Sequence, residues 1–275
     1  MCLIAWSWQP GQARTLLLAA NRDEWLDRPT LPMRWWRPDT ASAAEVLSGQ
    51  DLRSGGIWLG LTRHGRFAAV TNVRDPALER PHAPSRGLLP LRYLLGLHPL
   101  DGSTMDDCSP AAFAQTVQSC APAYAGFNLL LGDLRSGAMH WLSNHPLQNG
   151  NVAPGFHGLS NAALDTPWPK VRDLKAALAE SAELADADTP MSFAVLTQAL
   201  QREQIVPDDA LPQTGVSLDW ERALSAAFIR MPGYGTRCST LLRMDADGGA
   251  LVREVQHQPG VPSQLDFAWN WRTAR

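Results

Sequence analysis

The sequence predicts an α+β protein with layered antiparallel sheets and helices outside them. Three observations favour this fold class. Apolar segments occur as hairpin-like pairs, other segments carry apolar residues at helical spacing, and several strand segments are apolar on both alternating faces. A strand such as residues 16–20 therefore needs cover on both sides, which two sheets packed together with outer helices would provide.

Four hairpins account for most of the predicted strands. Each is a pair of apolar segments joined by a short connection that contains the Gly or Asp of a tight reversal. In chain order the pairs are 2–8 with 14–20, 56–62 with 66–73, 126–131 with 138–143, and 237–244 with 250–257. Two further strands are predicted at 156–160 and 266–271.

Four helices are predicted between the hairpins, because apolar residues recur there every three or four positions. They cover 86–97, 110–120, 168–181 and 190–203. Ser109 is a suitable N-cap for the second of these, and Pro110 suits its first turn. The polar stretches 74–85 and 204–219 are predicted surface loops. No internal repeat occurs, and residues 1–275 are predicted to form a single domain.

Composition argues against several classes of protein. The 275 residues are 45% hydrophobic with a formal net charge of −3 and no long basic stripe, so nucleic acid is not expected as the main partner. The seven histidines and four cysteines have no metal-ligand spacing, so we expect neither a metal site nor a disulfide framework, and a cytoplasmic location fits. No apolar run reaches the roughly 18 residues of a membrane helix, and no stable membrane insertion is expected. The oligomeric state is left open.

Cys2 is the residue that points most directly to chemistry. A side chain this small normally allows the initiator methionine to be removed, and the chain would then begin with a cysteine that bears a free α-amine. The thiol would be the nucleophile. The amine, with an ordinary pKa of about 7.7–8.0, would accept its proton near neutral pH. The alternative is an inert cysteine buried in a strand.

Polar residues at the end of the first hairpin are predicted to lie near Cys2. If 2–8 pairs with 14–20, the second strand ends beside the start of the first, which brings Asn21 and Asp23 close to Cys2 while Arg22 points to the other face. Asp23 would then hold the amine in line with the thiol. The alternative is a solvated, charged cap where the strand meets its loop.

Three further polar residues stand at the ends of apolar strands. Asn72 and Asn161 each end a strand, and Arg237 opens one. An asparagine amide is a good donor to a developing oxyanion, and a fixed arginine orients a thiolate and lowers its pKa. Each residue alone is more typical of a hydrogen bond at a turn or strand end. Together with Cys2 they would supply a nucleophile, a base and oxyanion donors.

Tryptophan is unusually frequent, at 11 residues. Trp25, Trp35, Trp36 and Trp58 cluster early in the chain. Large side chains of this kind are typical of the core and its rim, and the alternative is an aromatic wall for a flat or greasy ligand. Trp58 is predicted to contribute to such a substrate site.

Motifs along nearly the whole chain resemble those of a known family. They are Met1-Cys2, Ala19-Ala20-Asn21-Arg22-Asp23-Glu24, Arg28-Pro29 and the stretches 48–51, 55–60, 71–73, 85–87, 126–130, 158–161, 166–170 and 234–237. These motifs resemble the NRDE family, also called the transport and Golgi organization protein 2 family. That family is similar to N-terminal-nucleophile hydrolases of the choloylglycine hydrolase and penicillin V acylase type, which implies a four-layer αββα sandwich.

The resemblance also implies roles for individual residues. Cys2 matches the acylase nucleophile, Asp23 matches the aspartate of an Arg-Asn-x-Asp motif, and Asn72 matches the oxyanion asparagine. Asn161 resembles the asparagine at the end of a Thr-Asn-Ser-Pro-type strand. Arg237 resembles an arginine that follows a Pro-Gly-rich turn.

The predicted function is a cytoplasmic N-terminal-cysteine hydrolase that acts on a non-peptide amide or a thioester through acyl-Cys2. Asn21, Arg22 and Trp58 are predicted to bind the substrate, and no cofactor is expected. Ala20 stands where the acylases have an arginine, which bears on the substrate range. Eukaryotic family members are tied to haem and lipid handling, so the alternative is a non-catalytic protein that binds or carries haem or an acyl lipid in the same pocket. In both cases the partner is a small acyl, lipid or haem-like molecule.

Overall fold

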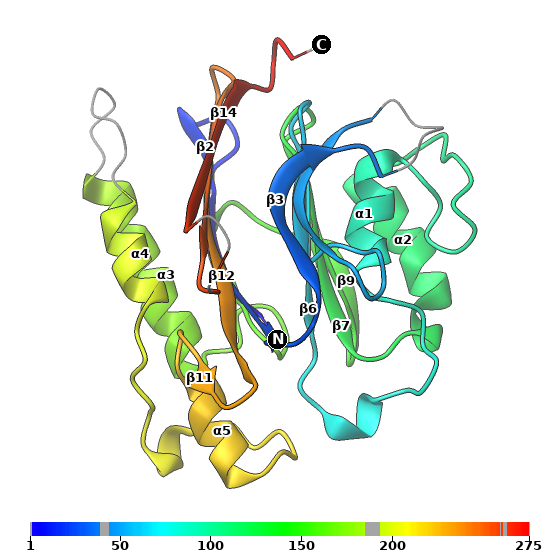
Figure 1. Ribbon diagram of the computed structural model, residues 1–275. Helices are drawn as coiled ribbons and strands as arrows, with labels where there is room; N and C mark the ends of the chain where they lie inside the picture. The colour runs from blue at the N-terminus through cyan, green and yellow to red at the C-terminus, as the bar shows by residue number, and fades with distance from the viewer. Residues whose placement is uncertain (1, 39–43, 185–192, 259, 261–262, 275) are drawn as a thin grey trace. The chain divides into compact units, whose positions relative to one another are not determined.

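The computed structural model describes residues 2–38, 44–184, 193–258, 260 and 263–274, which fall into two compact units (Figure 1). Unit 1 comprises Met1–Asp27, Arg74–Pro76 and Pro154–Ala268. Unit 2 comprises Arg28–Val73, Ala77–Ala153 and Trp269–Arg275. Each unit has its own antiparallel sheet and its own helices, so the predicted α+β class is confirmed. The packing of the sheets into four layers and the single domain 1–275 remain predictions.

The sheet of unit 1 has seven strands in the order β10-β1-β2-β12-β13-β14, with β11 paired to β12. The strands are β1 (Cys2–Trp8), β2 (Arg14–Trp25), β10 (Gly155–Leu159), β11 (Arg230–Met231), β12 (Tyr234–Asp245), β13 (Gly249–Gln256) and β14 (Gln264–Asn270). The pairs that join β10, β1, β2, β12 and β13 are antiparallel. β1 lies between β10 and β2, and its first residue, Cys2, pairs with β2, whereas the pairing with β10 begins at Ile4.

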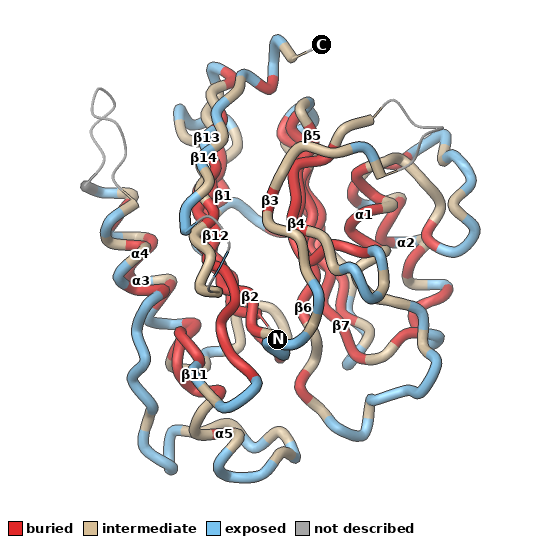
Figure 2. Tube along the Cα trace, in the orientation of Figure 1, coloured by how far each residue is buried: buried red, intermediate tan, exposed pale blue. Residues whose placement is uncertain are grey.

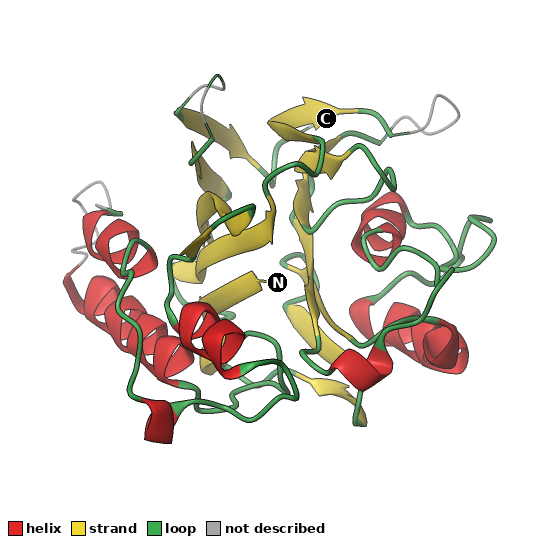
Figure 3. Cartoon of the chain, turned by 60° about the horizontal axis from the view of Figure 1, so that its bottom comes forward, coloured by secondary structure: helices red, strands yellow, loops and turns green. Residues whose placement is uncertain are grey.

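Helices cover one face of the unit 1 sheet. They are α3 (Pro169–Leu184) and α4 (Ala194–Leu200), while α5 (Leu218–Ser225) and the 3₁₀ helix η3 (Asp208–Ala210) follow in the chain. Alternate residues of β1 and β2, such as Leu3 and Leu17, pack with Leu174 of α3 and Leu196 of α4 in one buried cluster. The apolar stripe of each helix therefore supplies the cover that an apolar strand face needs (Figures 1 and 3).

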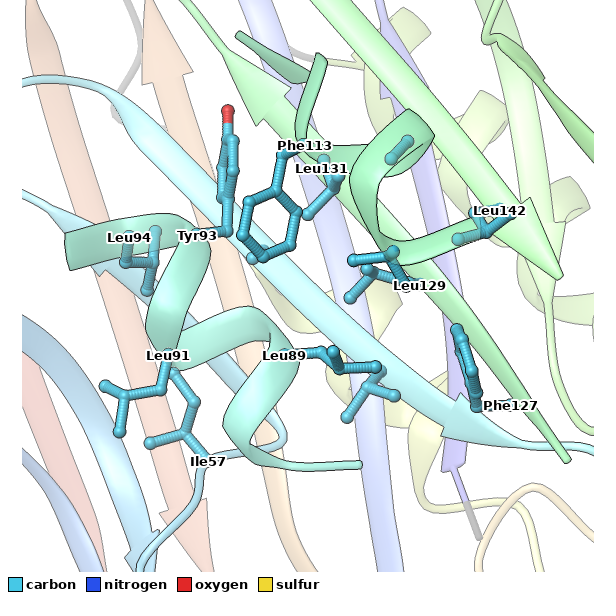
Figure 4. Close-up of a cluster of buried hydrophobic side chains, with 14 of the residues drawn as sticks. Ile57, Leu89, Leu91, Tyr93, Leu94, Phe113, Phe127, Leu129, Leu131 and Leu142 are labelled. Carbon is cyan, nitrogen blue, oxygen red and sulfur yellow. The ribbon is translucent and has the colours of Figure 1, made fainter. Parts of the chain in front are cut away.

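The sheet of unit 2 has seven strands in the order β3-β4-β5-β6-β7-β8-β9. They are β3 (Thr30–Trp36), β4 (Val46–Asp51), β5 (Leu59–Thr62), β6 (Arg66–Asn72), β7 (Phe127–Asp133), β8 (Ala138–Asn144) and β9 (Leu147–Asn151). The helices are α1 (Leu88–Leu95), α2 (Pro110–Cys120) and the 3₁₀ helices η1 (Pro76–Leu78) and η2 (Ala121–Ala123). Figure 4 shows the core that α1 and α2 form with the sheet, where Tyr93 and Phe113 meet edge to face with ring centroids 5.4 Å apart.

Local sequence signals explain where several elements begin and end. Ser109 caps α2, because its side chain accepts a hydrogen bond from the Ala112 amide at 3.3 Å, and Pro110 follows in the first turn. Gly96 ends α1 in the left-handed conformation with a φ of 70°. All four predicted hairpins are present, and Figure 2 shows that their strands carry most of the buried residues.

Several boundaries differ from prediction. The strand predicted at 56–62 begins only at Leu59, and the strand predicted at 237–244 begins earlier, at Tyr234. The helix predicted at 190–203 is described as α4 over Ala194–Leu200, and residues 190–192 lie outside the described part. Strands β3, β4, β9 and β11 were not predicted. Helix α5 begins inside the predicted loop 204–219, because Ser217 precedes a short amphipathic run.

The four cysteines Cys2, Cys108, Cys120 and Cys238 are all buried with free thiols. Among the described helices, none combines the length and the apolarity that a membrane crossing requires.

Candidate functional site

The register of unit 1 places Cys2 in a row with Arg22 and Cys238. Cys2 lies directly opposite Arg22 on β2, and Arg22 lies opposite Cys238 on β12. Directly opposed residues share a face of a sheet, so these three side chains lie on one face. Cys2 is 6% exposed, and the other two are also buried. The prediction did not include Cys238, because its neighbourhood depends on the pairing of β2 with β12.

The Cys2 thiol lies in an environment that disfavours its charged form. Burial raises the pKa of the Cys2 thiol, and the Arg22 guanidinium opposes that shift. The Cys2 backbone is also held in place, because Ser160 Oγ donates a hydrogen bond to the Cys2 carbonyl at 3.0 Å. Cys2 is therefore a positioned thiol that needs a base before it can act as a nucleophile.

Asn21 lies on the opposite face of β2 and supports the framework. Its Nδ2 donates to the carbonyls of Leu200 and Ala227, both at 2.8 Å, and its Oδ1 accepts from Ser239 Oγ at 2.6 Å. These three bonds tie β2 to the end of α4 and to β12. The side chain is fully buried among protein partners. The predicted substrate-binding role of Asn21 stays a prediction.

Asp23 is a buried residue of β2, two positions after Asn21. Its Oδ1 accepts from Thr236 Oγ1 at 2.7 Å, and Thr236 Oγ1 in turn accepts from the Ile229 amide at 2.9 Å. Burial raises the pKa of Asp23, and the nearby Lys170 ammonium opposes that shift. Asp23 and Cys2 also lie within electrostatic range of each other. The register corrects one part of the prediction, because Arg22, and not Asn21 or Asp23, lies on the face of β2 that carries Cys2.

Two buried cations, Lys170 and Arg74, accompany Asp23 and were missed in the sequence. Lys170 lies in the first turn of α3 and donates from Nζ to the Leu224 carbonyl at 2.8 Å. Burial, and then the Arg74 guanidinium, lower the pKa of Lys170 to about 8, while Asp23 opposes this shift. Arg74 Nη1 donates to Glu221 Oε2 at 2.7 Å. Arg74 falls in a predicted surface loop, so only the fold reveals that it is buried.

Asn161 lies at the end of β10 beside Cys2. Ser160 Oγ is 3.2 Å from Asn161 Oδ1, and the Asn161 carbonyl accepts from the Arg74 amide at 2.8 Å. Asn161 is 1% exposed. The structure thus brings Asn161 to the same end of the sheet as Cys2.

Arg237 lies in an irregularity of β12, between the residues that pair with Asp23 and Arg22. Its Nη1 donates to the Trp25 carbonyl at 2.8 Å, and its Nη2 donates to Gln258. Arg22, rather than Arg237, is therefore the arginine directly opposite Cys2. The predicted role of Arg237 toward the thiolate remains a prediction.

Two predicted site residues belong to unit 2 and are described there. Asn72 ends β6 opposite Phe127 of β7. Trp58 precedes β5 and is 8% exposed, and its carbonyl accepts from the Val70 amide at 2.8 Å. Their predicted roles in oxyanion and substrate binding remain predictions.

No cluster of three or more His, Cys, Asp or Glu side chains suited to a metal ion occurs within the residues that the structure describes. The titratable groups that act on Cys2 include Asp23, Arg22 and Glu24, and those that act on the neighbouring Lys170 include Arg74, Asp23 and Glu221. Such a set can hold or move protons and can bind a charged group of a ligand.

The comparison with protein families agrees with the motifs in the sequence. Residues 1–259 match the model of the family described as Transport and Golgi organisation 2. The chain belongs to this family. The match spans residues of both units and includes Cys2, Asp23, Lys170 and Arg237, so the family predicted from the motifs is confirmed.

Animal proteins are similar to the chain over most of its length. The Transport and Golgi organization protein 2 homologs of Bos taurus and Homo sapiens are 35% and 33% identical, and in each case 92% of both chains is covered. The Transport and Golgi organization protein 2 of Drosophila melanogaster is 26% identical, with 87% of this chain and 84% of the relative covered.

Two kinds of solved structure are distantly similar. A mutant conjugated bile acid hydrolase from Clostridium perfringens has 8% identity and a TM-score of 0.47, with 100% of this chain and 94% of that chain covered. An N-acylethanolamine-hydrolyzing acid amidase ortholog from Caenorhabditis elegans has 9% identity and a TM-score of 0.44, with 88% and 92% covered. TM-scores below 0.5 are too low to establish a common fold.

Proposed function

We propose that the chain is an N-terminal-cysteine hydrolase that cleaves a non-peptide amide or a thioester through an acyl-Cys2 intermediate. The observation that supports this proposal is the setting of Cys2. Its carbonyl is held by Ser160, its thiol is buried opposite Arg22, and Asp23 and Lys170 lie within electrostatic range. Because burial raises the pKa of the thiol, a base beside it is required at neutral pH. Once Met1 is removed, the Cys2 α-amine would be that base.

The proposed reaction has two halves. Cys2 Sγ attacks the substrate carbonyl while the α-amine takes the thiol proton, and Asn161 and Asn72 are the proposed donors to the oxyanion. The intermediate then expels the amine or thiol leaving group, which takes the proton from the α-ammonium. Water attacks acyl-Cys2, releases the acid and restores the thiol. Asp23 is proposed to orient the amine, and Arg237 is proposed to support the thiolate.

Substitution of Cys2 tests the mechanism. Cys2→Ala is expected to lower the hydrolysis rate by about 10³-fold or more, because the covalent step is lost. The measurement is turnover of a panel of acyl amides and acyl thioesters, with intact-mass analysis of the purified protein. Cys238→Ala is the matched control, since it removes a thiol of similar burial on the same face of the sheet.

Two results would contradict this mechanism. One is a Cys2→Ala protein that turns over a substrate at the parent rate. The other is an active preparation whose mass shows that Met1 is retained on every chain.

An aromatic group at the end of β2 favours a second candidate function, the binding or carriage of haem or an acyl lipid. Trp25 is 47% exposed and lies edge to face with Trp220 and Tyr234 at centroid distances of 5.9 and 5.4 Å. The name of the animal relatives, which refers to transport, fits such a role.

Haem titration separates the two functions. A stoichiometric spectral shift that Trp25→Ala abolishes, with no turnover by the parent protein, would support binding, whereas acyl turnover without a haem shift would support hydrolysis.

A further inference from the structure

Arg74 presents two buried nitrogen atoms that have no hydrogen-bond acceptor in the described part of the chain. Its side chain is 3% exposed, Nη1 is bound to Glu221, and the guanidinium lies 4.7 Å from the ring centre of Trp168. The two remaining atoms are Nε and Nη2. They lie on the same edge of the planar guanidinium, the edge that holds two oxygens of a carboxylate side by side. Because buried donors without acceptors cost free energy, this edge indicates that an acceptor from a ligand belongs there.

Lys170 adds a second cation with spare donors. Its ammonium is buried, and Nζ makes one hydrogen bond within the described residues, to the Leu224 carbonyl. An ammonium has three hydrogens to donate. Lys170 and Arg74 lie close enough for their charges to affect each other, so both would attract an anion bound at the free edge of Arg74.

Three of the four oxygens of the nearby carboxylates Glu221 and Asp23 accept hydrogen bonds from identified donors. Glu221 Oε1 accepts from the amide and the hydroxyl of Thr214 at 2.7 and 2.6 Å, and its Oε2 accepts from Arg74. Asp23 Oδ1 accepts from Thr236. In the described part of the chain, Glu221 binds Arg74 through Nη1, and neither Nε nor Nη2 is hydrogen-bonded to a carboxylate.

Arg74 is linked to Cys2 by a short chain of contacts. The Arg74 amide donates to the Asn161 carbonyl, and the adjacent Ser160 hydroxyl donates to the Cys2 carbonyl. Lys170 also lies within electrostatic range of Cys2. A small anion bound by Arg74 and Lys170 together would thus lie in the neighbourhood of the nucleophile.

We propose that Arg74, assisted by Lys170, binds a carboxylate of the substrate, so that the acyl compound attacked by Cys2 is one that also carries a carboxylate group. The substrate part of this inference rests on the proposed hydrolase function. The carboxylate site can be tested without hydrolysis, because the test requires only that a small reagent reaches the Cys2 thiol.

The test compares two alkylating reagents that differ in charge. Iodoacetate and iodoacetamide both form a bond from Cys2 Sγ to their methylene carbon and release iodide, but only iodoacetate carries a carboxylate. Peptide mass analysis gives the rate constant of each reagent at Cys2. The measured quantity is the rate constant for iodoacetate divided by that for iodoacetamide, and this ratio is then divided by the same ratio for glutathione. We expect this normalised ratio to be about tenfold above one in the parent protein, because a charge-assisted bidentate contact favours the anion.

Variants assign the preference to Arg74. The double variant Arg74→Gln/Glu221→Gln removes both members of the ion pair, so no unpaired charge is left buried, and its ratio is expected to fall to about one. Arg74→Lys keeps the charge but loses the two-nitrogen edge, and its ratio is expected to fall at least by half. Arg172→Gln, an exposed position on α3, is the matched control and should keep the parent ratio.

Three outcomes would overturn the proposal: a parent ratio near one, an unchanged ratio in the Arg74 variants, or a Cys2 that reacts with neither reagent. If thermal unfolding shows that the double variant does not fold, Arg74→Lys alone decides. Alkylation needs no hydrolytic turnover, so a protein that shows the preference but cleaves no acyl compound would refute the hydrolase and not the carboxylate site.

Discussion

Lys170 shows how a single buried charge can affect both the site and the stability of the chain. The ammonium lies at the start of α3, where its burial lowers the pKa to about 8, and Asp23 lies near enough to oppose the shift. A protonated Lys170 favours the charged form of Asp23, which the proposed mechanism needs beside the Cys2 amine. Near pH 8 both forms of Lys170 are populated, so the balance of charge around Cys2 changes in that range.

The pKa of Lys170 predicts a specific pH dependence of stability. Its ordinary value is 10.5, so between pH 8 and pH 10.5 the unfolded chain holds a proton that the folded chain releases. The contribution of Lys170 to stability therefore rises with pH across this window. Lys170→Met is expected to remove that rise.

Urea unfolding of the parent and of Lys170→Met at pH 7, 8.5 and 9.5 measures this effect. Arg172→Met is the control, because it makes the same kind of substitution at an exposed position of the same helix. The same dependence on pH in the parent and in Lys170→Met would show that the Lys170 ammonium is not destabilised by its surroundings.

Sequence reasoning identified part of the site because part of it is local. Cys2 and Asp23 belong to one hairpin, and pairing of its strands alone brings them together. Arg74 and Lys170 come from a predicted loop and from the start of a helix, and they meet Asp23 only through the fold of unit 1. Their residue types gave no signal, since isolated Lys and Arg residues are normally exposed.

At the scale of elements, the predictions succeeded where apolar residues follow one clear period. The hairpin of β1 and β2 and the helix α2 are examples. Strand β3 was missed because Pro32 interrupts it and most of its residues are only half-buried. Helix α5 was missed because eight residues are too short for a clear helical period, and its place depends on the burial of Glu221 and Leu224.

An ionic contact joins the edge strand β10 to α3. Asp165 accepts from His157 Nδ1 at 2.8 Å, from Lys175 Nζ at 2.7 Å and from the Gly158 amide at 2.9 Å. Burial would raise the pKa of Asp165, but the hydrogen bonds from His157 and Lys175 lower it to about 2. Asp165 has a φ of 58°, a conformation that asparagine also tolerates.

Asp165→Asn is expected to lower the free energy of unfolding by about 1 kcal/mol at pH 7, since the contact is partly exposed to solvent. A carboxyl with a lowered pKa stabilises the fold above its unfolded value of 3.8, and this contribution is lost as the pH falls toward 2. The difference between variant and parent in thermal unfolding should thus shrink between pH 4 and pH 2. Asp173→Asn, exposed on α3, should have little effect, and an equal loss at pH 7 and pH 2 would contradict the prediction.

At the scale of the whole molecule, each unit has its own hydrophobic core. The unit 2 cluster includes Phe113, Phe127 and Tyr93, and the unit 1 cluster joins β1 and β2 to α3 and α4. Separate cores are compatible with one cooperative unfolding transition or with two. The single-domain prediction requires that both units unfold in one cooperative transition.

Phe113→Ala tests this requirement. Truncation of a fully buried phenylalanine is expected to lower the free energy of unfolding by about 3–5 kcal/mol. Under the single-domain prediction, amide protection measured by hydrogen exchange falls together in β1 of unit 1 and in β6 of unit 2. A loss of amide protection that is confined to unit 2 would argue for two domains. Phe156→Ala, a partly exposed position on β10, is the control.

Trp271 has a practical consequence for anyone who prepares this protein. The family match stops at residue 259, yet Trp271 is 2% exposed and lies against the turn at Gly65, where an added Cβ would come within 3.0 Å of its ring. The neighbouring Trp269 donates from its indole nitrogen to the Arg63 carbonyl at 3.2 Å. A recombinant fragment trimmed to the family boundary would lose both indoles and uncover that turn, so cloning limits are better drawn beyond residue 271.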